Sequence, residues 1–288
     1  MRWFDEQLYI EHLKKGYAQS FEITRVLARK RSLFQNIAIF ETATFGRVLA
    51  LDGVIQVTEA DEFVYHEMLT HLPIMALGKA KDVLIIGAGD GGILREVLRH
   101  KQVKSAVMVE IDGAVIDLCK RFMPSLNGGA FKNSRADVIV GDGIDYVMKS
   151  QRDFDLIICD STDPIGPGEV LFTDTFYRNC RRLLAKRKGV LVTQNGVPFF
   201  QPDEVKTTKR RLGKIFKDMG FFYAVVPTYV GGMMTLAWAS DDPKLRKVPE
   251  ATIAKRWKKA NLKTRYYSPG VHTSAFKLPP FIANLAGK

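Results

Sequence analysis

Short apolar runs recur after residue 81, each separated from the next by enough residues for a helix. They occupy residues 83–86, 106–109, 138–140, 156–159 and 189–192. Because the runs are rich in β-branched residues and do not alternate with polar ones, they are typical of strands covered on both faces of a parallel sheet. Two later runs, at 222–226 and 233–239, indicate an antiparallel pair at the sheet edge. The pattern predicts an α/β fold with a doubly wound, Rossmann-like sheet of the methyltransferase type.

The N-terminal part of the chain has a different period. Runs at residues 21–27 and 35–40 alternate between apolar and polar residues, as half-buried strands do. Further along, Asp52-Gly53 separates two apolar runs, which is a strong signal for a β-hairpin. This part therefore predicts a small antiparallel β domain.

After Thr58 the apolar residues follow a helical period, at positions 64, 68, 69 and 72. Acidic residues precede them, as the positive end of a helix dipole prefers. We expect this helix to join the two parts of the chain. The predicted division is an N-terminal β-strand domain at residues 1–72 and a Rossmann-like catalytic domain at residues 73–288.

Composition and spacing narrow the class of protein. No apolar run in the 288 residues approaches the roughly 18 residues of a membrane span, and the start lacks the charged-then-apolar order of a signal peptide. We therefore expect a cytoplasmic protein without a membrane partner.

Cys119, Cys159 and Cys180 lack CxxC spacing, which favours buried free thiols. His66 and His71 are one residue too far apart for HExxH, so we expect no metal site.

The formal net charge of +12 would by itself suggest a polyanionic partner such as nucleic acid. However, much of the excess falls on three segments that we expect to be exposed helices, 178–188, 206–217 and 244–263. Two other segments, 48–78 and 153–177, contain acidic residues and no Lys or Arg. Because surface charge is screened beyond about 8–10 Å, an acidic cleft can dominate locally. The distribution favours a cationic small ligand over nucleic acid.

Acidic residues follow several of the predicted strands. Residues 87–92 match the GxGxxG fingerprint, but Asp90 lies inside this loop, where a carboxylate would repel pyrophosphate and attract an ammonium or sulfonium group. Glu110 ends the next strand and can accept hydrogen bonds from ribose hydroxyls. Asp142 and Gly143 follow the third strand and can bind an adenine amino group and ring. The alternative role for Glu110 and Asp142 is an ordinary helix N-cap.

The fourth strand leads into residues 160–168, which we predict to be the reaction centre. Asp160 and Asp163 lie three residues apart in a loop fixed by Pro and Gly residues. Because open α/β sheets bind ligands at the carboxyl ends of their strands, these acids should face the Gly loop. A turn or cap role is the alternative for an isolated Asp.

Together these motifs resemble those of the spermidine synthases, the polyamine aminopropyltransferase family, over nearly the whole chain. The resemblance is carried by LDGVIQ at 51–56, DEFVYHEM at 61–68, the Gly loop at 87–92, DSTDPIGP at 160–167 and PTYVGG at 227–232. The chain departs from the family pattern at Ala88, where a Gly is common. It also departs at Val230, where an aromatic residue is often found.

The resemblance implies transfer of the aminopropyl group of decarboxylated S-adenosylmethionine to putrescine, giving spermidine and 5′-methylthioadenosine. The donor would be a co-substrate, so no resident cofactor is expected, and a homodimer or homotetramer is implied. Asp160 would be the catalytic proton acceptor. The implied donor-binding residues are Gln35, Asp90, Glu110, Asp142, Gly143 and Pro167. The implied amine-binding residues are Gln56, Tyr65, His66, Asp90, Asp160, Asp163 and Tyr229.

Two alternatives remain at this stage, a related enzyme and a protein of a different class. An S-adenosylmethionine-dependent methyltransferase would use the same sheet and nucleoside residues, but its intact cofactor carries a carboxylate that Asp90 should repel. A non-catalytic nucleic-acid-binding protein would use the basic helices and show steep salt dependence. That second alternative leaves the acidic strand ends unexplained.

Overall fold

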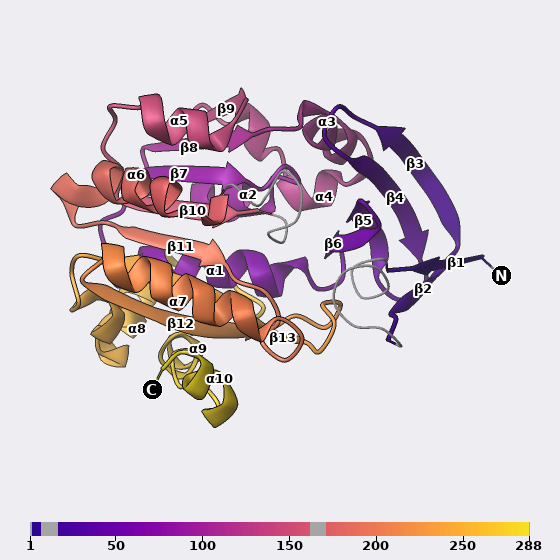
Figure 1. Cartoon of the computed structure of the whole chain (residues 1–288). Helices are drawn as coiled ribbons and strands as arrows, with labels where there is room; N and C mark the ends of the chain where they lie inside the picture. Colours follow the sequence, from indigo (N-terminus) through magenta and orange to yellow (C-terminus); the bar gives the residue numbers. More distant parts are fainter. Residues whose placement is uncertain (1, 7–16, 162–170, 288) are drawn as a thin grey trace.

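The computed structural model describes residues 2–6, 17–161 and 171–287. Its main body is a seven-stranded sheet with the strand order β12-β13-β11-β10-β7-β8-β9 (Figure 1). The pairs from β11 to β9 are parallel, whereas β13 and β12 run antiparallel. The strands are β7 (Asp82–Gly87), β8 (Ser105–Glu110), β9 (Ala136–Val140), β10 (Leu156–Asp160), β11 (Val190–Gln194), β12 (Asp218–Val225) and β13 (Met233–Ser240). The predicted α/β sheet with its antiparallel edge pair is confirmed.

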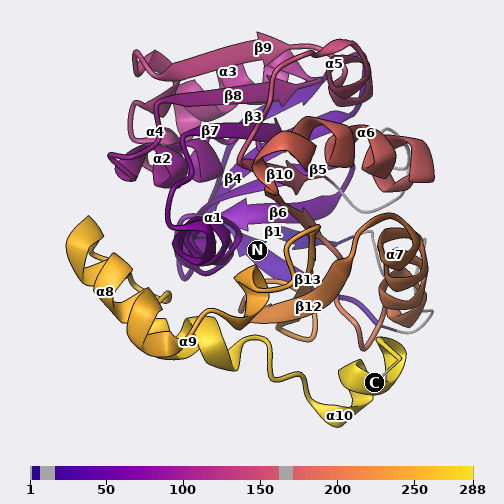
Figure 2. The same ribbon diagram turned by 90° about the vertical axis from the view of Figure 1, so that its left-hand side faces the viewer.

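Helices cover both faces of this sheet (Figure 2). On one face lie α1 (Glu62–Leu77), α2 (Gly92–Arg99) and α8 (Glu250–Ala260), and their apolar side chains form one core with the strands. On the other face α5 (Gly143–Lys149), α6 (Asp174–Leu184) and α7 (Pro202–Ile215) form a second core. The remaining helices are α3 (Gly113–Phe122), α4 (Pro124–Asn127), α9 (Pro269–Ser274) and α10 (Pro280–Leu285), with 3₁₀ turns at Ala130–Lys132, Ala185–Arg187 and Leu245–Lys247.

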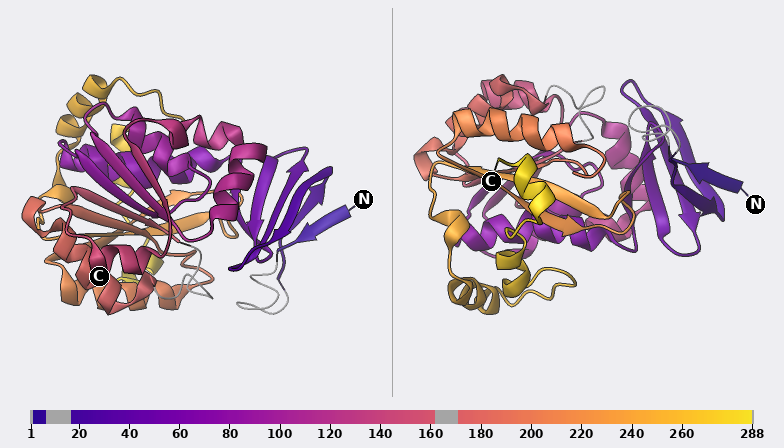
Figure 3. Two further views of the ribbon diagram at one scale, coloured as in Figure 1. Left: turned by 90° about the horizontal axis from the view of Figure 1, so that it is seen from above. Right: turned by 60° about the horizontal axis from the view of Figure 1, so that its bottom comes forward.

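A separate four-stranded antiparallel sheet stands beyond the carboxyl ends of the parallel strands (Figure 3). It consists of β3 (Arg25–Arg31), β4 (Asn36–Thr42), β5 (Gly46–Leu51) and β6 (Val54–Thr58), with the Asp52-Gly53 turn between the last two. One face packs on α3 and α4 through Ile37, Ile39, Leu49 and Val57. The other face packs against the two-stranded sheet β1 (Arg2–Asp5) and β2 (Ser20–Ile23). This sheet is thereby fixed against the helices that flank the seven-stranded sheet.

The observed elements differ from the predicted ones in two places. The run at 21–27 is broken by a bend at Thr24, so that β2 and β3 enter different sheets. The helix predicted to residue 72 continues through Pro73 to Leu77 and ends at Gly78, whose φ is 72°. Since residues 64–76 of α1 are all buried, packing compensates for the hydrogen bond that Pro73 cannot donate. The division between residues 72 and 73 stays a prediction.

Other sequence expectations concern thiols, membranes and charge. Cys119, Cys159 and Cys180 are buried free thiols, as predicted. Within the described residues, no helix is both long and apolar enough to span a membrane. The three basic segments overlap α6, α7 and α8, and α8 buries only Ile253 completely.

Candidate active site

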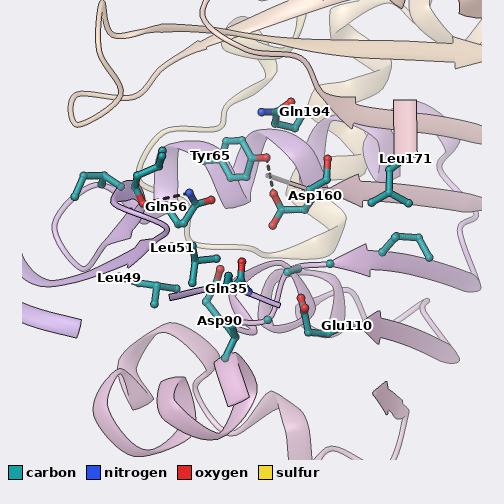
Figure 4. A pocket seen from close by; sticks show the side chains of 18 of the residues that line it. Gln35, Leu49, Leu51, Gln56, Tyr65, Asp90, Glu110, Asp160, Leu171 and Gln194 are labelled. Atoms are coloured by element: carbon teal, nitrogen blue, oxygen red, sulfur yellow. Dashed lines mark hydrogen bonds between the residues drawn. The ribbon is translucent and has the colours of Figure 1, made fainter. Parts of the chain in front are cut away.

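A pocket lies between the carboxyl ends of β7, β8 and β10 and the N-terminal sheet (Figure 4). The chain runs from β7 outward to β8 and β9, then returns to β10 and β11 on the other side of β7. Such a reversal leaves a crevice at the carboxyl ends of the strands, where open α/β sheets bind ligands. Both sheets supply its walls, because Gln35 and Gln56 come from the N-terminal part and Glu110 and Asp160 from the strand ends.

The turn after β7 brings two of the acidic strand ends together. Gly87 has a φ of 83°, and a Cβ on it would overlap the backbone carbonyl of Asp160. Ala88 N donates to that same carbonyl at 3.3 Å. The Gly loop therefore lies directly against the end of β10.

Asp90 is buried in this loop and has a cationic partner. Its Oδ1 accepts from the backbone N–H of Gly92 at 2.6 Å and lies 3.5 Å from Nε2 of His66. Burial opposes ionisation of Asp90, but His66 and this hydrogen bond outweigh it and lower the pKa of the carboxyl. Burial likewise opposes protonation of His66, yet Asp90 and Glu62 raise its pKa to about 10. Asp90 and His66 therefore form an ion pair.

The pKa of Asp160, at the end of β10, is shifted in the opposite direction to that of Asp90. Burial and the charge of Asp90 raise its pKa to about 7, although a hydrogen bond from Tyr65 and the charge of His66 work against this. Tyr65 Oη donates to Asp160 Oδ1 at 2.6 Å. Asp160 is thus a carboxylate that can take up a proton near neutral pH.

Two aromatic rings stand next to this carboxylate. The rings of Tyr65 and Tyr229 meet edge to face with centroids 5.8 Å apart, and Tyr229 Oη donates to the backbone carbonyl of Gln56 at 2.7 Å. Rings with a polar tip suit an alkyl chain that ends in a charged group. The pocket thus places two aromatic rings beside a carboxylate.

On the other side of the Gly loop, Glu110 and Asp142 make local hydrogen bonds. Glu110 Oε1 accepts from Asp112 N at 2.8 Å, and Asp142 Oδ1 accepts from Ile144 N at 2.7 Å as the N-cap of α5. The alternative N-cap role is therefore correct for Asp142, although Asp142 also lines the pocket. Burial raises the pKa of Glu110 to about 7, because the Asp112 N–H compensates only in part.

The structure brings most of the predicted site residues to one place. Those that line the pocket are Gln35, Gln56, Tyr65, His66, Asp90, Glu110, Asp142, Gly143, Asp160 and Tyr229. Asp163 and Pro167 lie outside the described residues.

Sequence reasoning missed other polar residues of the lining, among them Glu6 and Gln194. Gln194 ends β11, so the strand-end signal used for Glu110 and Asp160 could have found it. Glu6 follows β1, and its Oε1 accepts from Ile55 N at 3.0 Å. No sequence pattern places Glu6 near the strand ends.

Two family models match the chain. Residues 62–248 match the spermine/spermidine synthase domain, and residues 3–59 match the spermidine synthase tetramerisation domain. The chain belongs to the spermine/spermidine synthase family. It is therefore an aminopropyltransferase, and the methyltransferase alternative is not favoured.

Curated relatives within this family match the chain over almost its whole length. It is 52% identical to polyamine aminopropyltransferase 1 of Pseudomonas aeruginosa over 97% of this chain and 98% of that protein. It is 48% identical to the polyamine aminopropyltransferase of Erwinia tasmaniensis over 96% of this chain and 97% of that protein.

Solved spermidine synthases have the same fold. A spermidine synthase in complex with the transition-state analogue AdoDATO superimposes with a TM-score of 0.92 at 36% identity, covering 99% of this chain and 95% of that one. The spermidine synthase of Thermotoga maritima superimposes with a TM-score of 0.89 at 34% identity, covering 99% and 94%.

Proposed function

We propose that this aminopropyltransferase moves the aminopropyl group of decarboxylated S-adenosylmethionine to putrescine, giving spermidine and 5′-methylthioadenosine. The observation that carries this proposal is that Asp90 and Asp160 both line a pocket whose lining, among the described residues, contains no Lys or Arg. Both substrates are cations. A carboxylate-lined pocket offsets their mutual repulsion.

For the donor, we propose that Glu110 accepts from the ribose hydroxyls and Asp142 from the adenine amino group. The backbone of Gly143 and the side chain of Gln35 would complete the nucleoside site. Pro167 belongs to this set by resemblance only. Asp90 and Asp160 would hold the ammonium of the aminopropyl group, because two carboxylates flank the point where the Gly loop meets β10.

For the acceptor, Gln56, Tyr65, His66 and Tyr229 would line the amine site, with Asp163 added by resemblance. The neutral amine nitrogen uses its lone pair to form a bond with the methylene carbon attached to sulfur. The carbon–sulfur bond breaks, its electron pair stays on sulfur, and the uncharged thioether leaves. Before this bond forms, one proton must leave the ammonium form of the acceptor, and we assign its uptake to Asp160. The new secondary nitrogen then carries the positive charge that sulfur has lost.

The environment of Asp160 makes this proton transfer less unfavourable. Moving a proton from an amine of pKa about 10 to a carboxylate of pKa about 4 costs roughly 8 kcal/mol. With the pKa of Asp160 at about 7, the cost falls to about 4 kcal/mol. Burial of Asp160 thus lowers the free-energy cost of deprotonating the amine.

Three further parts of the proposal concern the whole protein. The match of residues 3–59 to a tetramerisation domain supports an oligomer, and we propose a homodimer or homotetramer. We propose that the donor is consumed as a co-substrate, with no resident cofactor. We also propose a cytoplasmic location without a nucleic-acid or membrane partner.

A competition assay tests the proposed function. The protein is incubated with decarboxylated S-adenosylmethionine and equimolar putrescine, cadaverine, agmatine and spermidine, and the products are identified by mass. Spermidine and 5′-methylthioadenosine should dominate, with some cadaverine product, since a misfitted methylene changes discrimination by only about 1–3 kcal/mol. Predominant aminopropylagmatine would overturn putrescine as acceptor. Methylated amine in a parallel tube with intact S-adenosylmethionine would overturn the reaction itself.

A further inference from the structure

A row of four charged side chains leads from the surface of α2 into the pocket. Arg95 Nη2 donates to Glu62 Oε2 at 2.7 Å, and the same oxygen lies 2.6 Å from Nδ1 of His66. On the far side of the imidazole ring, Nε2 of His66 lies 3.5 Å from Asp90 Oδ1. Of these four, Asp90 and His66 line the pocket, and Glu62 and Arg95 act on it through them.

Backbone geometry fixes each member of this row. Glu62 and His66 are one turn apart on α1 and therefore share a face of the helix. The imidazole ring packs where a side chain at residue 92 would be, because a Cβ on Gly92 would overlap it. Arg95 also donates through Nη1 to the backbone carbonyl of Leu126 at 2.5 Å, which ties α2 to α4. The row is built into the junction of three helices.

His66 brings a positive charge into a pocket whose other charged side chains, within the described part of the chain, are carboxylates. The lining of the pocket contains the carboxylates of Glu6, Asp90, Glu110, Asp142 and Asp160, and His66 is the one basic side chain among its described residues.

Three groups of the described residues face the ring of His66. Glu62 on α1 and Asp90 in the Gly loop favour its protonated form, and the neutral ring of Tyr65 packs against it edge to face at 6.0 Å. The positive charge of His66 acts in turn on Asp160, where it favours the ionised carboxylate.

We propose that Glu62 and Arg95 are positioning residues of the transfer reaction, which hold His66 as an imidazolium beside Asp90 and so favour the ionised form of both Asp90 and Asp160. Glu62 supplies the anion at Nδ1, Arg95 keeps that anion charged and in place, and Nε2 is left to face Asp90. This role rests on the proposed function, because it acts on the assigned proton acceptor. The protonation state of His66, on which this role depends, can be measured without turnover.

The first test is the pH profile of kcat for Glu62→Gln. The amide can still accept a hydrogen bond from Nδ1–H, but it removes the negative charge. His66 should then lose its proton near neutral pH, and the acidic limb of the profile should move up by about one pH unit. His66→Gln should move the limb by the same amount, and the double variant should move it no further.

Glu96→Gln is the matched control. Glu96 is a more deeply buried acid on α2 that also pairs with Arg95, at 2.9 Å, but its histidine partner is His71 and not His66. Its substitution should leave the acidic limb within experimental error of the wild type. Thermal unfolding of each variant shows whether it is folded at the assay temperature. A shift in Glu96→Gln equal to that in Glu62→Gln, or shifts that add in the double variant, would overturn the proposal.

A second measurement does not depend on activity. The imidazole resonances of His66, assigned by comparison with His66→Gln, are followed by NMR from pH 6 to pH 9. His66 should remain protonated across this range in the wild type and titrate within it in Glu62→Gln and in Arg95→Met. A His66 that titrates near pH 6.5 in the wild type would overturn the proposal. A wild-type enzyme without turnover would overturn the proposed function. The NMR measurement would still show whether His66 is protonated.

Discussion

Asp90 and Asp160 share one pocket, but their partners give them opposite properties. The pKa of Asp90 is lowered because His66 outweighs burial, and the pKa of Asp160 is raised to about 7 because burial and Asp90 outweigh Tyr65. Asp90 is therefore a permanent anion, which suits binding a cation. Asp160 can exchange a proton, which suits accepting one from the amine.

The substitution Asp160→Asn should lower kcat by about 100-fold or more, because no other group takes over proton uptake. Steady-state kinetics with both substrates varied checks this. Asp142→Asn is the control: it should raise the KM of the sulfonium donor and leave kcat nearly unchanged. Equal effects of the two variants on kcat would contradict the division of roles.

Ala88 occupies a backbone conformation that favours glycine. Its φ is 62°, in the left-handed region where a Cβ is strained. Ala88→Gly should therefore raise the free energy of unfolding by up to about 1 kcal/mol, despite the greater freedom that Gly gives the unfolded chain. Urea denaturation measures the change. Ala254→Gly, inside α8, should instead lower the free energy by about 1 kcal/mol.

At the scale of elements, α1 connects the parts that build the site. Asp61, just before the helix, accepts from the backbone N–H and the hydroxyl of Thr228 at 2.9 and 2.6 Å, and so fixes the loop that carries Tyr229. Glu67 accepts from the backbone N–H groups of Arg265, Tyr266 and Tyr267, at 2.8, 2.9 and 2.8 Å. The helix that carries Tyr65 and His66 is thus tied to the C-terminal segment as well.

Glu67→Ala should lower the free energy of unfolding by about 3 kcal/mol, because it leaves three backbone donors without their acceptor. Urea denaturation of variant and wild type measures this. Asp145→Ala removes an exposed carboxylate paired only with Lys149 and should cost less than about 1 kcal/mol. A loss below about 1 kcal/mol for Glu67→Ala would show that water replaces the carboxylate.

The elements also show what could be predicted from the sequence. The parallel strands and the Asp52-Gly53 hairpin depend on local patterns, so their positions followed from apolar runs and turn residues. The continuation of α1 through Pro73 and the separation of β2 from β3 depend on packing against distant residues, which no local pattern reveals.

For the candidate site, the acidic strand ends could be found because parallel strands end at one edge of a sheet. Glu62 and Arg95 could not be found in that way. Their contact depends on how α1 and α2 pack and on the direction of two long side chains. The raised pKa of Asp160 likewise depends on burial.

At the scale of the whole molecule, the site reduces the stability of the ligand-free protein as pH rises. The pKa values of Asp160 and Glu110 are about 7, above their ordinary values near 4. Between those values each of these two carboxyls binds more protons in the folded state than in the unfolded state, so their contribution to the free energy of unfolding falls with increasing pH.

Asp160→Asn should therefore stabilise the ligand-free protein at pH 8 and have a much smaller effect at pH 5. Thermal unfolding at the two pH values, without substrates, provides the measurement. A change in melting temperature of the same size at both pH values would show that Asp160 is not held at a raised pKa. The same variant loses activity, so gain of stability and loss of turnover should occur together.

The oligomeric state is a second prediction at this scale. Sedimentation velocity should give a mass of two or four times the 32.4 kDa of the chain. The reason is the match of residues 3–59 to a tetramerisation domain. A species of 32.4 kDa at micromolar concentration would contradict the proposed homodimer or homotetramer.

The packing of the N-terminal sheet on α3 and α4 has a consequence for how the protein is made. The ribosome completes β6 at Thr58, but the apolar residues that cover this sheet, from Val115 to Leu126, emerge much later. At about 5–20 residues per second, the nascent chain presents an uncovered apolar sheet face for several seconds. Until α3 and α4 have emerged, this apolar face is exposed to aggregation, and a chaperone or a low local concentration would protect it.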